Sequence, residues 1–326
     1  MLHNNFFKRW NPSIFQGNLN KKNYFEGWYF KLVSEDEKNV FAFIPGISFE
    51  KNKKGHCFIQ FVNVSNGESK YFTFSMWDFS YREDRFEVKI ANNIFSKDFI
   101  DININDDDFR IKGKVYFQDT VPFPSKIHKP GIMGWYSFVP FMECYHGVVS
   151  INHSLKGSLI INEELYNLDS GKGYIEKDWG KSFPSSWIWL QCNNFKDSNS
   201  SFMLSIAKIP WLKNHFVGFL GFLYINGILL NFATYTGAII KDITIIKNKL
   251  FITIEDKNFK INLCSIKEDG VELKAPSSGK MERTIRESLN SKIHIQVFNK
   301  HYKKIFDDIG TTVGLEISGD LKDFKK

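Results

Sequence analysis

The amino-acid sequence predicts an all-β protein of the sandwich or barrel type. Short segments rich in aromatic and β-branched residues recur along all 326 residues, and Asn, Asp or Gly bounds each of them. Aromatic residues make up 16% of the chain, including 33 phenylalanines, and this composition favours strands over helical bundles. An Asn-Gly dipeptide between two apolar runs adds a hairpin signal.

The first half of the chain contains one series of such segments. They lie at residues 24–33, 40–44, 56–64, 71–77, 85–90, 100–104, 109–117, 143–151, 156–161 and 165–168. Residues 122–140 interrupt the series with four prolines and several bulky aromatic residues. We expect them to form a long ordered loop, of the kind that lines a barrel mouth or an interface.

A second series follows, with predicted strands at residues 187–191, 202–209, 238–245, 250–254, 259–264, 271–274, 293–298 and 314–317. Residues 278–290 fit both a helical stripe and a strand edge, and the sequence leaves this element open. The two series predict two domains, residues 1–168 and 169–326. Tyr29-Phe30 in the first series resembles Trp189-Leu190 in the second, which is a sign of internal duplication.

Residues 216–240 carry no charged side chain and are long enough to span a bilayer as a helix. However, Asn226-Gly227 lies in their middle between two apolar runs, and this dipeptide is typical of a two-residue hairpin turn. The segment is therefore predicted to be a buried hairpin, which could also line a hydrophobic ligand pocket.

Charge and cysteine content restrict the classes of partner and compartment. The formal net charge is +7, but the lysines are spread along the chain and no arginine-rich stripe of the kind that binds nucleic acid is present. The four cysteines lack zinc-binding spacing and predict reduced, buried thiols in a cytoplasmic protein. The N-terminus contains no apolar run of signal-peptide length.

Acids, histidines, glycines and tryptophans are concentrated in residues 142–193. Glu176 and Asp178 lie two residues apart, so on a strand they point to the same face, whereas Lys177 points to the opposite face. Buried carboxylates among indoles are costly without a purpose, which makes this segment the candidate site. Glu143, His146 and His153 match no zinc signature, so no metal is predicted.

Several long motifs in this chain resemble the tocopherol cyclase family, in the right order and over nearly the whole length. They are Phe25-Glu26-Gly27-Trp28-Tyr29-Phe30-Lys31, Met142-Glu143-Cys144-Tyr145-His146-Gly147-Val148, Gly173-Tyr174-Ile175-Glu176-Lys177-Asp178-Trp179-Gly180, Phe183-Pro184, Trp187-Ile188-Trp189-Leu190-Gln191-Cys192-Asn193, Phe232-Ala233-Thr234-Tyr235 and Gly314-Leu315-Glu316. More distantly, the architecture is similar to carotenoid hydratases and lipocalin-like Diels–Alderases. The resemblance implies two consecutive antiparallel lipocalin-like β-barrels packed against each other.

The resemblance also implies a reaction, in which a prenylated hydroquinone or related terpenoid closes a ring and gives a chromanol. No cofactor, redox step or metal is needed. We expect no plastid-targeting extension of the kind that the plant enzymes carry, and the bias to Asn, Lys and Ile suggests an AT-rich bacterial genome. A cyclase-like pocket is therefore a firmer expectation than this substrate.

Ring closure begins with proton transfer to an alkene, which requires a carboxyl group whose pKa is raised by burial. Asp178 and Glu176 are the candidate acids, and His146 is the candidate base for the phenol. Aromatic faces would stabilise the cation. The proposed substrate-binding residues are Glu26, Trp28, Tyr29, Trp77, Tyr145, Trp179, Trp187 and Trp189.

Structural roles are alternatives for each of these residues. Asp178 could bond to backbone N–H groups of the glycine-rich turn, Glu26 could be a buried acid paired with Lys or Arg, and His146 and each tryptophan could belong to the core. At the level of function, the alternatives are a non-catalytic lipocalin-like binder of a hydrophobic metabolite and an enzyme that adds water to an alkene. The positive charge and the apolar substrate class also suggest transient contact with a membrane surface.

Overall fold

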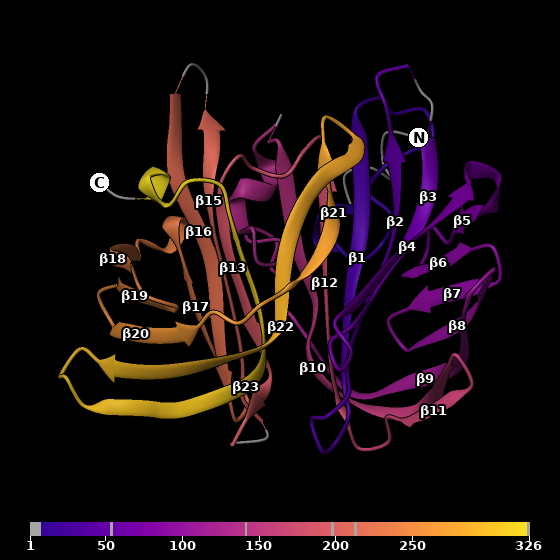
Figure 1. Ribbon diagram of the computed structural model, residues 1–326. Helices are drawn as coiled ribbons and strands as arrows, with labels where there is room; N and C mark the ends of the chain where they lie inside the picture. Colours follow the sequence, from indigo (N-terminus) through magenta and orange to yellow (C-terminus); the bar gives the residue numbers. More distant parts are fainter. Residues whose placement is uncertain (1–7, 53–54, 141, 197–198, 212–213, 325–326) are drawn as a thin grey trace. The chain divides into compact units, whose positions relative to one another are not determined.

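The computed structural model describes residues 8–324 except 53–54, 141, 197–198 and 212–213 (Figure 1). The regular elements in this described part of the chain are β-strands and five short 3-10 helices. The helices are η1 (Lys8–Trp10), η2 (Met76–Asp78), η3 (Gly134–Phe138), η4 (Thr234–Thr236) and η5 (Leu321–Phe324). The predicted all-β class is confirmed.

One antiparallel sheet contains the strands of the first half of the chain. Its strands are β1 (Tyr24–Val33), β2 (Val40–Phe49), β3 (Gly55–Asn63), β4 (Glu68–Ser75), β5 (Phe79–Tyr81), β6 (Glu87–Ile90), β7 (Asn93–Ser96), β8 (Phe99–Asp106), β9 (Phe109–Pro122), β10 (Cys144–Ile161), β11 (Glu164–Asn167) and β12 (Lys172–Gly180). The order across the sheet is β4-β3-β2-β1-β12-β10-β9-β8-β7-β6-β5, and β11 pairs with β10. The edge strands β4 and β5 are joined by η2, so the sheet curls back on itself into a nearly closed barrel.

A second antiparallel sheet follows. Its strands are β13 (Trp187–Cys192), β14 (Asn194–Phe195), β15 (Ser201–Trp211), β16 (Asn214–Ile225), β17 (Ile228–Ala233), β18 (Ile239–Ile246), β19 (Lys249–Glu255), β20 (Phe259–Ile266), β21 (Val271–Ser277), β22 (Lys280–Asn299) and β23 (Lys304–Ser318). The order is β17-β16-β15-β13-β23-β22-β20-β19-β18, while β14 pairs with β23 and β21 with β22.

The two sheets follow the same path. Each runs outward for four main strands, turns through a three-residue 3-10 helix (η2 or η4), and returns until its last strand pairs with its first. β1 therefore corresponds to β13, and β12 corresponds to β23. Tyr29 lies opposite Glu176 and Trp189 lies opposite Glu316, so in each sheet an aromatic residue of the first strand faces a glutamate of the last strand. This up-and-down meander is lipocalin-like.

Each sheet surrounds its own apolar core. Trp28, Phe30 and Leu32 of β1 lie in the first core, and Ile188 and Leu190 of β13 lie in the second. Because side chains alternate along a strand, the intervening residues of β1 and β13 project from the face opposite each core. That second face carries most of the polar residues of interest.

The chain divides into two compact units that differ from the expected halves. Unit 1 comprises residues 1–183 and 273–284, and unit 2 comprises residues 184–272 and 285–326. The first boundary lies after β12 instead of at residue 168, because β12 pairs with β1 and β10 on both of its edges. Residues 273–284 return to unit 1, where both the amide and the carbonyl of Lys274 bond to the side chain of Gln60.

Two local predictions have clear outcomes. The charge-free segment forms the hairpin of β16 and β17, and Asn226 and Gly227 turn it with φ values of 47° and 87°. Both values lie in the left-handed region that this type of turn requires. Residues 280–290, part of the segment left open, belong to strand β22.

Among the described residues, no helix has the length and apolar character needed to cross a bilayer.

Candidate functional site

The predicted acids and the predicted base meet on two neighbouring strands of unit 1. In the antiparallel pairing of β10 and β12, His146 lies opposite Asp178 and Val148 lies opposite Glu176. Strand alternation places Tyr174, Glu176 and Asp178 on one face of β12. The sheet thus brings together side chains that are about 30 residues apart in the sequence.

These side chains form a continuous row of polar contacts, which we call the His146 relay: Cys144, Asp178, His146, Glu176 and Tyr174. His146 Nδ1 lies 2.9 Å from Asp178 Oδ1, and its Nε2 lies 3.5 Å from Glu176 Oε2. The Tyr174 hydroxyl donates to Glu176 Oε2 at 2.7 Å. The Cys144 thiol donates weakly to Asp178 Oδ1 at 3.8 Å.

The members of the relay differ in their access to solvent. The side chains of His146 and Glu176 are 10% and 6% exposed, whereas that of Asp178 is 26% exposed. Both contacts to Asp178 fall on Oδ1, so Oδ2 is the carboxylate oxygen that the described residues leave available. Asp178 is therefore the member through which the relay can reach another molecule.

The charges of the relay hold a proton on His146. Burial by itself lowers the pKa of this imidazole, but the carboxylates of Asp178 and Glu176 and the hydrogen bond to Asp178 outweigh it and raise the pKa to about 9. At neutral pH His146 is accordingly an imidazolium. Burial also raises the pKa of Tyr174 well above its ordinary value, so its hydroxyl stays a neutral donor.

Three side chains of the relay also have the composition of a metal-ligand set, because ligand atoms of His146, Glu176 and Asp178 all lie within 4.8 Å of one another. The two ring nitrogens of an imidazole diverge, and here each faces a different carboxylate. The arrangement therefore suits a proton shared between His146 and the two carboxylates better than a metal ion bound by all three side chains.

The opposite face of β12 carries a different ionic group. Lys177 projects there, as the alternation predicted, and its Nζ lies 2.5 Å from Glu26 Oε1. Both side chains are fully buried. Burial lowers the pKa of Lys177 to about 8, against the opposing charge of Glu26.

This ion pair anchors residues 11–17, which we call the N-terminal strap. Glu26 accepts hydrogen bonds from the amides of Gln16 and Gly17 at 2.7 and 2.9 Å. Lys177 donates to the carbonyl of Pro12 at 2.9 Å. The Trp28 indole donates to the carbonyl of Ser13 at 2.7 Å. These contacts give Glu26 and Trp28 a structural role on the core side of the sheet.

The structure separates the other predicted substrate-binding residues. Tyr29 projects to the face of the His146 relay, opposite Glu176. Tyr145 and Trp179 stack on each other at 5.7 Å between ring centroids, and Tyr145 donates to the carbonyl of Val139. Trp77 lies on η2 and is 96% exposed, so it does not line an enclosed pocket as expected.

Trp187 and Trp189 belong to unit 2, where both are buried on the face of β13 away from its core. The Trp187 indole donates to Glu316 Oε2 at 2.6 Å, and Glu287 lies opposite Glu316 in the ladder of β22 and β23. Glu316 lies opposite Trp189, as Glu176 lies opposite Tyr29 in unit 1. Unit 2 thus carries its own carboxylates on the equivalent face.

Sequence reasoning missed Tyr174, Cys144 and Glu316 as polar partners. Tyr174 lies two residues before Glu176 and Cys144 lies two residues before His146, so the period of a strand could have found them. Glu316 and Trp187 are more than a hundred residues apart, and no local pattern joins them.

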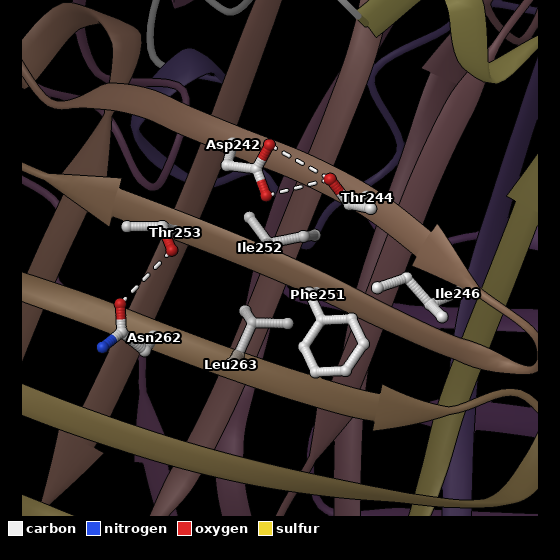
Figure 2. Close-up of a pocket in the computed structure, with 8 residues that line it drawn as sticks. All are labelled: Asp242, Thr244, Ile246, Phe251, Ile252, Thr253, Asn262 and Leu263. Atoms are coloured by element: carbon white, nitrogen blue, oxygen red, sulfur yellow. Dashed lines mark hydrogen bonds between the residues drawn. The ribbon is translucent and has the colours of Figure 1, made fainter.

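Unit 2 also has an open groove of about 570 Å³ on the outer side of β18, β19 and β20. Figure 2 shows Asp242 bonded to Thr244 and Thr253 bonded to Asn262 along this groove, beside Phe251. These polar groups satisfy one another, and the groove contains none of the predicted site residues.

Comparisons with known proteins agree with the fold and the motifs. The sequence model of the tocopherol cyclase-like family matches residues 104–319, which include the whole His146 relay. A chloroplastic protein of Oryza sativa subsp. japonica described as a probable tocopherol cyclase is 24% identical over 197 residues, covering 57% of this chain and 42% of that protein. The chloroplastic tocopherol cyclase of Zea mays is 23% identical and covers 57% and 41%. The chain thus matches less than half the length of these relatives.

Solved structures share the fold at low sequence identity. CghA has a TM-score of 0.55 at 8% identity and covers 91% of this chain and 88% of its own. Kievitone hydratase from Nectria haematococca has a TM-score of 0.50 at 12% identity, covering 91% and 89%. A Nitrosomonas europaea protein described as a putative AttH has a TM-score of 0.53 at 12% identity, covering 90% of this chain and 92% of its own. The match over residues 104–319 covers well over half of the chain, which therefore belongs to the tocopherol cyclase-like family.

Proposed function

We propose that this protein catalyses the intramolecular ring closure of a prenylated hydroquinone or a related terpenoid, with the His146 relay as its acid and base. The reaction is an isomerisation: one C–H bond and one C–O bond form while an alkene and a phenolic O–H bond are lost. Electrons balance within the substrate, so the step requires no redox cofactor.

The geometry of the relay supports a complete proton cycle. His146 passes its proton to Asp178 Oδ1, rotation of the carboxyl group about its Cβ–Cγ bond turns that O–H toward the accessible side, and the carboxylic acid protonates the alkene carbon. A tertiary cation forms, and the phenol oxygen attacks it. His146 is then neutral and accepts the phenolic proton through the relay, which restores the starting state. Glu176, held by Tyr174, positions the ring and favours its charged form.

The raised pKa of His146 changes the role first assigned to it. As an imidazolium at neutral pH it is unable to accept the phenolic proton before the cycle begins. It becomes a base only after Asp178 has delivered a proton to the alkene. The order of the two transfers, acid step before base step, follows from this charge state.

Aromatic faces would stabilise the cation by about 0.5 to 2 kcal/mol each. Tyr29 is the candidate on the face of the relay, and Trp187 and Trp189 remain candidate substrate contacts on unit 2. Glu26, Trp28 and Trp179 are better explained by the N-terminal strap and by stacking.

The single observation that carries the proposal is the row Asp178–His146–Glu176 within the segment matched by the family. The test incubates purified protein with a prenylated hydroquinone and separates products by chromatography with mass spectrometry. Asp178→Asn should reduce chromanol formation at least about 100-fold, the usual contribution of a general acid. Asp107→Asn removes an exposed surface carboxylate and is the matched control. Equal activity of native protein and Asp178→Asn would refute the assignment.

The same experiment distinguishes the alternatives. A hydrophobic compound that co-purifies and is recovered unchanged, with no isomeric product from any quinol offered, would indicate a binding protein. A product heavier by one water would indicate alkene hydration at Asp178. We also propose that the protein is cytoplasmic and contacts membranes peripherally, because prenylated substrates reside in lipid.

A further inference from the structure

A surface of unit 1 that the proposed reaction does not use combines cations with exposed apolar side chains. It consists of η1 (Lys8–Trp10) and residues 123–140, which we together call the aromatic loop surface. Neither residues 1–25 nor residues 123–140 contain an acid. Lys8, Arg9, Lys126 and Lys129 supply four fixed positive charges, and His128 lies between the last two.

Specific contacts join the two segments into one surface. The Trp10 indole donates to the carbonyl of Ile127 at 2.9 Å. The Trp10 ring packs edge-on against Phe138 at 5.6 Å, and the Arg9 guanidinium lies 5.7 Å from the Phe138 centroid. The aromatic loop surface is therefore a built feature, held by a hydrogen bond and by ring contacts.

The tip of the loop presents an apolar side chain between two lysines. Lys126 and Lys129 bond to each other through both backbone amides at 3.0 Å, which closes a tight turn around Ile127 and His128. Ile127 at this tip is 85% exposed. Trp135, nearby in the loop, is 47% exposed. The apolar surface of Ile127 is therefore in contact with water, and insertion into a lipid phase would remove that contact.

We propose that the aromatic loop surface docks on an anionic phospholipid bilayer. Lysine and arginine side chains attract acidic head groups, while Ile127 enters the acyl boundary and Trp135 lies at the interface, where tryptophan is favoured. The absence of acids in both segments removes the repulsion that an anionic membrane would exert. A nucleic acid would also attract the cations, but it would offer no apolar environment for the Ile127 side chain at the tip.

This docking surface deepens the proposed membrane contact by naming its residues and its lipid class. It does not depend on which reaction the relay performs. It would bring unit 1 to the phase in which a prenylated molecule is dissolved, so that the substrate need not cross water to reach the protein.

The test measures co-sedimentation of the full-length chain with vesicles of phosphatidylcholine alone and of phosphatidylcholine mixed with phosphatidylserine. The mixed vesicles should bind the protein at low salt and release it as salt rises, because screening weakens the attraction. Lys126→Glu/Lys129→Glu should weaken binding about 30-fold or more, given the usual contribution of two membrane-facing charges. Ile127→Ser should weaken it at unchanged charge.

The matched control is Lys89→Glu/Lys112→Glu, which reverses two exposed lysines elsewhere on unit 1 and changes the net charge equally. This control should keep most of the binding. Equal loss in both double variants would show that only net charge matters and would overturn the proposal, as would equal binding to neutral vesicles or none to either. The cyclisation of a detergent-dispersed prenylated hydroquinone is measured on the same variants. This assay needs no membrane, so it tests the proposed function independently of membrane binding.

Discussion

The charge state of His146 yields the sharpest prediction. Its pKa of about 9, against an ordinary 6.5, corresponds to about 3 kcal/mol of preference for the imidazolium. Asp178 is the nearer carboxylate, at 2.9 Å, and Glu176 is farther, at 3.5 Å. Asp178→Asn should therefore lower the pKa of His146 by about 1 to 3 pH units. Glu176→Gln should lower it by less.

The assay is an NMR titration of histidine side chains between pH 5 and 10, with the His146 signal assigned by its loss in His146→Asn. Only eight histidines occur in the chain, which makes the spectrum tractable. Asparagine keeps a carbonyl oxygen that can still contact the ring, so the charge is the main change. Circular dichroism of each variant checks that the fold is retained.

The same pKa predicts how stability depends on pH. A histidine whose pKa is raised on folding contributes stability that is fully present below its unfolded pKa and is lost as pH rises through its folded pKa. The window is therefore pH 6.5 to about 9. Urea unfolding should show native protein losing about 1 to 3 kcal/mol more than Asp178→Asn across this window, because Glu176 still raises the pKa of His146 in the variant. A native His146 that titrates near 6.5, or one that responds more to Glu176→Gln, would refute the reasoning.

Two further predictions concern the frame around the relay. Glu26→Gln leaves the buried Lys177 ammonium without its countercharge and should reduce the free energy of unfolding in urea by about 3 to 5 kcal/mol. Adding Lys177→Met should restore part of this loss, and a loss below about 1 kcal/mol would contradict a buried pair. Gly173→Ala would place a methyl group into the ring of His153 and should cost about 1 to 3 kcal/mol by overpacking. A melting temperature equal to that of the native protein would show that His153 has room to move.

The parts of this structure that sequence could predict are those that depend on local periodicity. The hairpin at Asn226-Gly227 follows from a turn that few dipeptides allow. The shared face of Glu176 and Asp178, with Lys177 opposite, follows from the two-residue period of a strand. Each of these needs only neighbouring residues, so one sequence is enough.

The parts that sequence missed depend on pairing between distant strands. Nothing near Glu26 indicates that its partner is Lys177, because the two meet only when β1 pairs with β12. Trp77 is an aromatic residue of the type that can stabilise a cation, yet it lies on a 3-10 helix at the surface. The domain boundary depends on which strands pair with β12, and this pairing is determined by contacts across the whole sheet.

The division of the chain also determines when unit 1 can be completed during synthesis. Residues 273–284 belong to it, and they bond to it at Ser48, Gln60 and Ser182. A ribosome that has just finished residue 183 must still add about 90 residues before this segment emerges, a delay of roughly 5 to 20 s. Until then Ser48, Gln60 and Ser182 lack these hydrogen-bond partners. A fragment ending at residue 183 would keep that incomplete state permanently.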